Sequence, residues 1–89
     1  MEKVLKKYRE RLASCGLEPV RHPTEAIPTS KESALAHCLW MIGEAEKFLQ
    51  SGDEESVLKA HRWLGFIQGV LWAFQVFPVD DLKADNRSL

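Results

Sequence analysis

Residues 63–77 read Trp-Leu-Gly-Phe-Ile-Gln-Gly-Val-Leu-Trp-Ala-Phe-Gln-Val-Phe, the most apolar run in a chain of 89 residues. The run is shorter than the about 20 apolar residues that cross a bilayer, and glutamines interrupt it. We therefore expect a helix in a soluble protein. Such a helix is apolar on nearly every face, whereas one partner helix covers only one stripe of it. The remaining apolar surface needs cover from other copies of the chain, so we expect a homo-oligomer.

A tight turn precedes this helix and sets the direction of its neighbour. Gly52 suits the left-handed end of one helix, and Asp53 suits the N-cap of the next. A link this short requires antiparallel helices. The first helix is predicted to start at Thr29, through a capping box in Thr29-Ser-Lys-Glu, and to run to about Gln50. Its apolar stripe is Leu35, Cys38, Leu39, Ile42, Ala45 and Leu49.

The second helix is predicted from about Glu54 to Phe77, where Pro78 stops it. Residues 29–78 thus predict a long antiparallel helical hairpin.

The segments outside the hairpin complete an all-α fold with a single domain over residues 1–89. Residues 1–16 predict an N-terminal helix that Gly16 ends. Residues 17–28 contain three prolines and predict an extended connector, pinned to the core by Leu17, Val20 and Ile27. Residues 79–89 predict an acidic tail with one short helical turn and disordered last residues. The stripe of the N-terminal helix is Leu5, Tyr8, Leu12 and Cys15.

Composition excludes several classes of function. A net charge of −1 gives no general affinity for nucleic acid or anionic membranes. The charged N-terminus lacks the apolar core of a signal peptide, so we expect a cytoplasmic protein in which Cys15 and Cys38 are reduced and mostly buried. A disulfide between them is the alternative. His22, His37 and His61 match no zinc pattern, and no catalytic motif is present. We therefore expect no metal, no cofactor and no enzymatic activity.

Three features remain as candidates for binding. Gly65 and Gly69 lie four residues apart and leave a smooth notch on a helix, for a crossing helix or for a flat ligand. Arg62 and Trp63 precede the notch, and Arg62 is either an ordinary surface or ion-paired arginine or a fork for phosphate oxygens. Tyr8 is the only tyrosine, and it is either a core-edge residue with its hydroxyl in water or a stacking face for a base.

Three stretches carry a resemblance to a known family: Ala36-His-Cys-Leu-Trp-Met41, His61-Arg-Trp-Leu-Gly-Phe-Ile-Gln-Gly-Val-Leu-Trp72 and Asp81-Leu-Lys-Ala-Asp-Asn-Arg87. They resemble small phage proteins with the hairpin domain that anti-CBASS and anti-Thoeris sponges share. The resemblance covers residues 30–87, roughly two thirds of the chain. Its most specific point is the Arg62-Trp63 pair with a glycine downstream. Met1–Arg11, with Tyr8, is similar to the T4-like branch of the anti-CBASS group.

The resemblance implies a phage-encoded homohexamer in the host cytoplasm. Such proteins bind the cyclic di- and trinucleotides that host immune synthases make, such as cGAMP, and hold them away from the effector without cleaving them. By this resemblance Arg62 contacts the phosphates of cyclic trinucleotides, beside Trp63, Gly65 and Gly69. Thr29 of a neighbouring subunit assists, with Thr24 as the second candidate.

The same resemblance places cyclic dinucleotides at separate sites. There Tyr8 stacks on a base, and Lys7, Arg11 or Lys31 supplies the cation. The expected function is therefore blocking of CBASS effector activation by sequestration. The alternative, from a different class, is a helical adaptor or inhibitor that binds a host protein through Trp63, Trp72 and Phe77.

Overall fold

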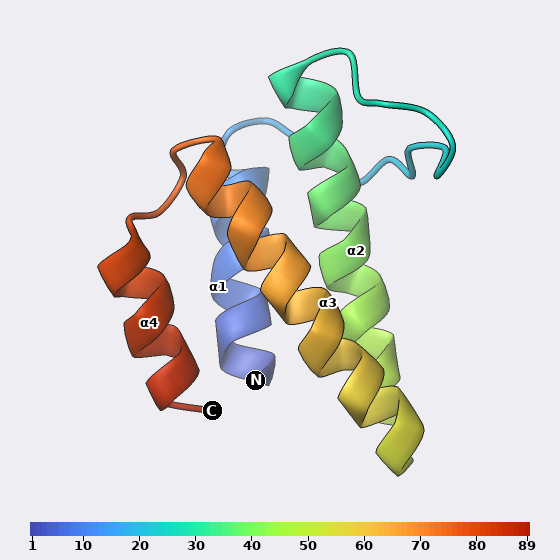
Figure 1. Ribbon diagram of the computed structural model, residues 1–89, viewed down its shortest axis with the longest axis vertical. Coiled ribbons are helices and arrows are strands. Elements are labelled where there is room, and N and C mark those ends of the chain that lie inside the picture. The colour runs from blue at the N-terminus through green and yellow to red at the C-terminus, as the bar shows by residue number, and fades with distance from the viewer.

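Four helices and no strand make up the computed structural model, which describes residues 1–89. They are α1 (Glu2–Ala13), α2 (Lys31–Ser51), α3 (Glu54–Ala73) and α4 (Val79–Arg87). Figure 1 shows α3 running obliquely across the molecule, with α2 on one side of it and α4 on the other. The radius of gyration of 12.6 Å is close to the about 12 Å expected for a folded domain of this length. The prediction of an all-α fold is confirmed.

The turn between α2 and α3 forms as the sequence predicts. Gly52 closes α2 with φ +76°, and the Asp53 carboxylate caps α3 by accepting from the Ser56 backbone N–H at 2.9 Å. These two helices make the largest contact between elements in the molecule. The buried side of α2 includes Leu35, Cys38, Leu39, Ile42 and Ala45, five of the six stripe residues, and Leu49 is half-buried.

The start of α2 differs from its prediction by one residue. Ser30, not Thr29, is the N-cap, and its hydroxyl accepts from the Ser33 backbone N–H at 3.0 Å. The Ser33 hydroxyl oxygen accepts in return from the Ser30 backbone N–H at 3.3 Å. A serine therefore takes the reciprocal position that the sequence assigned to Glu32.

The end of α3 also departs from its prediction, because the helix stops at Ala73 rather than at Phe77. Gln75 adopts a left-handed conformation with φ +64°. Its N–H donates to the Trp72 carbonyl at 3.0 Å, and the Val76 N–H donates to the Leu71 carbonyl at 2.8 Å. This is a Schellman motif with glutamine in the position that usually holds glycine. The turn sends Val76 and Phe77 back against the core.

The N-terminal helix buries Val4, Leu5, Tyr8 and Leu12. It ends at Ala13, short of the predicted range of residues 1–16, and Cys15 beyond its end is exposed instead of buried. Gly16 has a φ of +80°, which suits glycine, but it lies two residues beyond the C-cap, Ser14, instead of directly ending the helix. Cys38 is buried and both thiols are free.

The connector is held by hydrogen bonds rather than by the predicted apolar pins. Val20 and Ile27 are exposed, Ile27 to 87 %, and of the three pins only Leu17 packs against the core. The Val20 N–H donates to the Ala36 carbonyl at 3.1 Å, and the His22 N–H donates to His37 Nδ1 at 2.9 Å. These bonds tie an extended segment to the first turns of α2.

The tail forms a complete helix, α4, where the sequence predicted one turn. Leu82 is its buried apolar residue. Polar groups fix the rest: Asp85 lies beside Lys7 of α1, and Asn86 exchanges two hydrogen bonds with Gln68 of α3, at 2.8 and 3.2 Å. Partners this distant in sequence cannot be found from the local pattern of residues 79–89. None of the four helices combines the length and the apolar character needed to cross a membrane.

Candidate functional site

One exposed stripe of α3 carries the predicted residues Arg62, Gly65 and Gly69. At about 100° per residue these three side-chain positions fall within one sector of the helix. All three are exposed, and a Cβ added to either glycine would meet nothing within 4 Å. Phe66 and Trp72 border the stripe on either side and are 59 % and 56 % exposed. The notch is therefore open, and no helix of this chain crosses it.

Arg62 has no ion-pair partner in this chain, although a surface ion pair with a glutamate was one reading of its position. Its guanidinium lies in solvent at the border between the polar and apolar halves of α3. Five N–H donors in a planar fork are therefore free for an anion. Trp63, its neighbour, turns away from the stripe toward α2 and stacks edge-on against Phe48 at 5.0 Å.

Tyr8 is not the exposed ring that a stacking role needs. Its side chain is fully buried, and its hydroxyl donates to Asp85 Oδ2 at 2.7 Å. Gln68 Nε2 donates to the same hydroxyl at 3.1 Å. Burial, together with the nearby Asp85 carboxylate, raises the pKa of Tyr8 well above its usual value of 10.0. The prediction that its hydroxyl lies in water is wrong, because the hydroxyl is bonded to Asp85 of α4.

The three predicted cations near Tyr8 do not form one site. Lys7 is paired with Asp85 at 3.0 Å, and its ammonium lies 5.1 Å from the centre of the Phe77 ring. Arg11 and Lys31 instead line a separate small cavity of about 240 Å³, with Phe74 of the α3–α4 link. The structure thus brings two of the three cations together but leaves Tyr8 out.

The two candidate threonines both lie on the exposed connector. Thr29 precedes the N-cap of α2 and does not line the cavity that contains Arg11 and Lys31. Thr24 instead lines a cleft between the connector, α2 and α3. The structure therefore favours Thr24 over Thr29 as a residue next to a cavity.

That cleft is a feature the sequence did not reveal. It measures about 310 Å³, and its walls include Arg21, Thr24, His37, Trp40, Trp63 and Phe66. The one available signal was the presence of Trp40 beside the apolar stripe of α2, which gave no indication that Trp63 would face it. Burial, and then the nearby His22 and Arg21 side chains, lower the pKa of His37, which favours its neutral ring.

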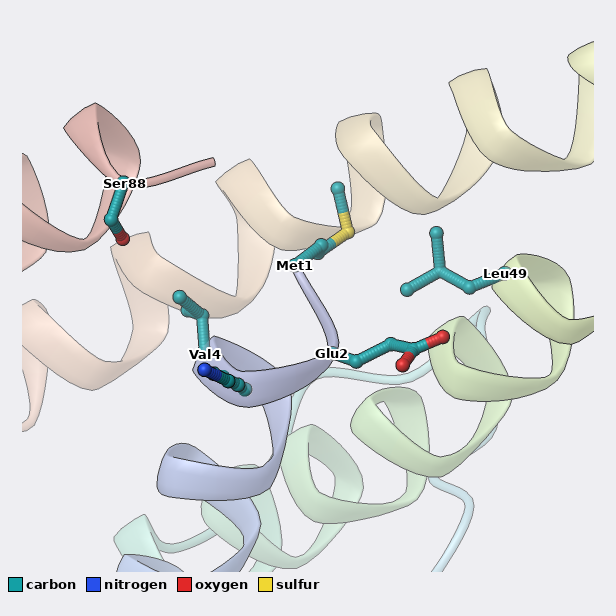
Figure 2. Close-up of a pocket in the computed structure, with 6 residues that line it drawn as sticks. Met1, Glu2, Val4, Leu49 and Ser88 are labelled. Carbon is teal, nitrogen blue, oxygen red and sulfur yellow. The ribbon is translucent and has the colours of Figure 1, made fainter.

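A different hollow opens where the chain starts. Figure 2 shows Met1, Glu2 and Val4 at the start of the chain, Leu49 from the end of α2, and Ser88 just after α4. It measures about 570 Å³ and contains none of the predicted site residues. No group of three His, Cys, Asp or Glu side chains in the molecule could hold a metal ion.

Comparison of the chain with protein-family models, with curated proteins and with solved structures finds no match.

Proposed function

We propose that this protein is a phage-encoded homo-oligomer that binds cyclic di- and trinucleotides of its host and sequesters them without cleavage. The observation that carries the proposal is Arg62, an exposed and unpaired guanidinium beside an open apolar stripe on α3. The sequence resemblance supplies the class of ligand. The stripe supplies a reason for the protein to assemble.

Assembly through α3 would give Arg62 the neighbours that it lacks in one chain. The open backbone at Gly65 and Gly69 allows another copy to approach closely, and contact would remove Trp72 from water. One arginine on a surface is a weak anion site. Several arginines related by symmetry around one axis would form a strong site for the phosphates of a cyclic trinucleotide.

Cyclic dinucleotides need a second site in this proposal. The predicted stacking on Tyr8 requires α4 to move away from α1, because the Tyr8 ring is fully buried in this structure. Sequestration itself requires no catalyst, only slow release of the ligand, which sites enclosed between subunits favour.

The oligomer and the ligand can be tested in one set of samples. Light scattering should give a mass that is a multiple of 10.2 kDa, with and without ligand. Cyclic tri-AMP and cyclic GMP–AMP should each raise the melting temperature, because a ligand that binds only the folded state stabilises it. The absence of any shift in a correctly assembled sample would refute the proposal.

Arg62→Ala is the specific variant, and Lys83→Ala is its matched control. Both residues are exposed helical cations without an ion pair, but Lys83 lies on α4, away from the stripe. Arg62→Ala should weaken cyclic tri-AMP binding by about tenfold or more while the mass stays unchanged. If it breaks the assembly instead, Arg62 is a structural residue.

The adaptor function remains as a second candidate, because Phe66 and Trp72 expose aromatic surface that a partner helix could cover. Of the aromatic residues predicted for that role, Trp72 is exposed, whereas Trp63 and Phe77 are half-buried. A monomeric mass without any cyclic nucleotide binding would favour this candidate.

A further inference from the structure

The cleft between the connector, α2 and α3 is lined by aromatic rings. Trp40 and Trp63 lie 6.1 Å apart with their planes tilted by 42°, and His37 stacks on Trp40 at 5.5 Å. Phe66 stands at its rim and is more than half exposed. Ring faces of this kind bind planar ligands, because stacking favours any flat aromatic group.

A cation completes the cleft. The Arg21 guanidinium lies 5.5 Å from the centre of the Trp40 ring, and Arg21 has no ion-pair partner. Arginine in this position keeps donors free for phosphate oxygens while it stacks on the ring. The cleft therefore combines aromatic rings with a hydrogen-bond donor for an anion.

The backbone holds Arg21 in place before any ligand arrives. Both of its chain neighbours are hydrogen-bonded to α2: Val20 to the Ala36 carbonyl at 3.1 Å, and His22 to His37 Nδ1 at 2.9 Å. The His22 ring reaches the Ala26 carbonyl oxygen at 3.0 Å, which ties the connector to itself. Preorganisation of this kind lowers the entropy lost on binding.

The same hydrogen bond fixes the tautomer of His37. Since Nδ1 accepts from the His22 N–H, the neutral ring carries its proton on Nε2. His37, with its Nε2–H donor, thus lines the cleft in addition to Thr24 and its hydroxyl. Donors of this type can bond the edge of a base.

From these contacts we infer that the cleft binds one nucleobase against Trp63 and Phe66, with the attached phosphate on Arg21, whose guanidinium lies over Trp40. A volume of about 310 Å³ lies at the small end of ligand sites, which range from about 300 to 1,000 Å³. It therefore holds one ring system rather than a whole cyclic dinucleotide. The inference rests on the proposed function and deepens it: the cleft receives one base of the cyclic ligand, a role that buried Tyr8 cannot fill in the closed chain.

Calorimetric titration with cyclic GMP–AMP, and separately with AMP and GMP, tests the assignment. Arg21→Ala should weaken binding by about tenfold or more, the loss expected for a charge-assisted hydrogen bond. Arg21→Lys keeps the charge without the planar fork, so it should give an intermediate affinity. Lys59→Ala is the matched control: its ammonium lies 5.6 Å from the Trp63 ring but does not line the cleft, so affinity should stay unchanged.

The outcomes separate this assignment from the proposed function. If Arg21→Ala and Lys59→Ala change the affinity for cyclic nucleotides equally, the assignment of the cleft as a base site is wrong and the proposed function stays intact. Binding of AMP or GMP that depends on Arg21, without binding of any cyclic nucleotide, would support the cleft and refute the proposed function. No binding of any of these nucleotides to the native chain would overturn both. Arg21 lies on an exposed connector, so circular dichroism should show an unchanged fold in its variants.

Discussion

Replacing Tyr8 by phenylalanine removes one hydroxyl from a polar network that joins α1, α3 and α4. That hydroxyl donates to Asp85 at 2.7 Å and accepts from Gln68 at 3.1 Å. The ring itself is fully buried, and phenylalanine keeps its shape. The substitution therefore tests the two hydrogen bonds while leaving the apolar packing in place.

The expected loss of stability depends on the hydrogen bonds that Asp85 and Gln68 keep when the hydroxyl is removed. A hydrogen bond to a charged group contributes about 1.5–3 kcal/mol, and a neutral one about 0.5–1.5 kcal/mol. Asp85 retains Lys7 at 3.0 Å and Gln68 retains Asn86 at 2.8 Å, so neither is left without a partner. We therefore expect the free energy of unfolding to fall by about 2 kcal/mol, the lower part of the summed range. In a domain of this size the melting temperature should fall by about 8–16 °C.

A double-mutant cycle with Asp85→Asn tests whether the loss of stability comes from the hydrogen bond between Tyr8 and Asp85. Chemical denaturation of the four proteins should give a coupling energy of about 1 kcal/mol or more, because the two residues contact each other directly. The slope of the unfolding free energy against denaturant should not change, since the surface exposed on unfolding is the same. A Tyr8→Phe protein as stable as the native chain, with no coupling to Asp85, would refute the reasoning that this network holds α4.

The same hydroxyl gives the prediction a pH signature. Burial raises the pKa of Tyr8, so the folded state favours the protonated form more strongly than the unfolded state does. Stability from this group is complete below pH 10.0 and is lost as the pH rises above it. Because Tyr8 is the only tyrosine, tyrosinate absorbance reports it without interference. Native protein should titrate at higher pH than protein unfolded in urea, and Tyr8→Phe should lack this alkaline loss of stability.

Three further results are expected. Gln75→Gly should raise the unfolding free energy by about 1 kcal/mol, because φ +64° strains a residue with a Cβ; a lower melting temperature would contradict this. A thiol reagent should modify exposed Cys15 in the native protein, whereas Cys38, whose pKa burial raises to about 12, should react only after unfolding; equal rates for both would be the opposite result. The Ser51 hydroxyl and the Ser56 N–H lower the pKa of Asp53 from 3.8 to about 2. The stability that Asp53 contributes by capping α3 is therefore complete above pH 3.8 and is lost as the pH falls toward 2. In acid titrations of stability, Asp53→Ala should lack this loss between pH 3.8 and 2.

Local signals predicted the parts of the fold whose causes are local. Gly52 and Asp53 terminate and cap adjacent helices through bonds within a few residues, and the structure has both at the predicted positions. Of the stripe residues that helical spacing predicted, three of the four in α1 and five of the six in α2 are buried. The start of α2 was missed by one residue because Thr29 and Ser30 are both acceptable caps. The structure distinguishes them by the two hydrogen bonds that Ser30 exchanges with Ser33.

The missed features depend on contacts between distant parts of the chain. Pro78 marks a position that the helix cannot pass, but the earlier stop at Ala73 requires the turn at Gln75 that packs Phe77 against Tyr8 at 5.4 Å. Likewise, α4 is held in part by Lys7, a residue from the other end of the sequence. The burial of Tyr8 follows from this, because its own surroundings in the sequence contain no group that could cover it.

The distribution of ion pairs changes which cations can serve as anion sites. In the N-terminal helix, Lys6, Lys7 and Arg9 are each paired with a carboxylate, whereas Lys3 and Arg11 are not. The charge of the three paired cations is balanced inside the chain, so an incoming phosphate would have to displace a carboxylate. Arg21 and Arg62 lack such partners; Arg21 lies over the Trp40 ring, and Arg62 lies one helical turn before Phe66. In a protein of net charge −1, these two unpaired arginines are therefore better placed to bind a phosphate than the paired cations Lys6, Lys7 and Arg9.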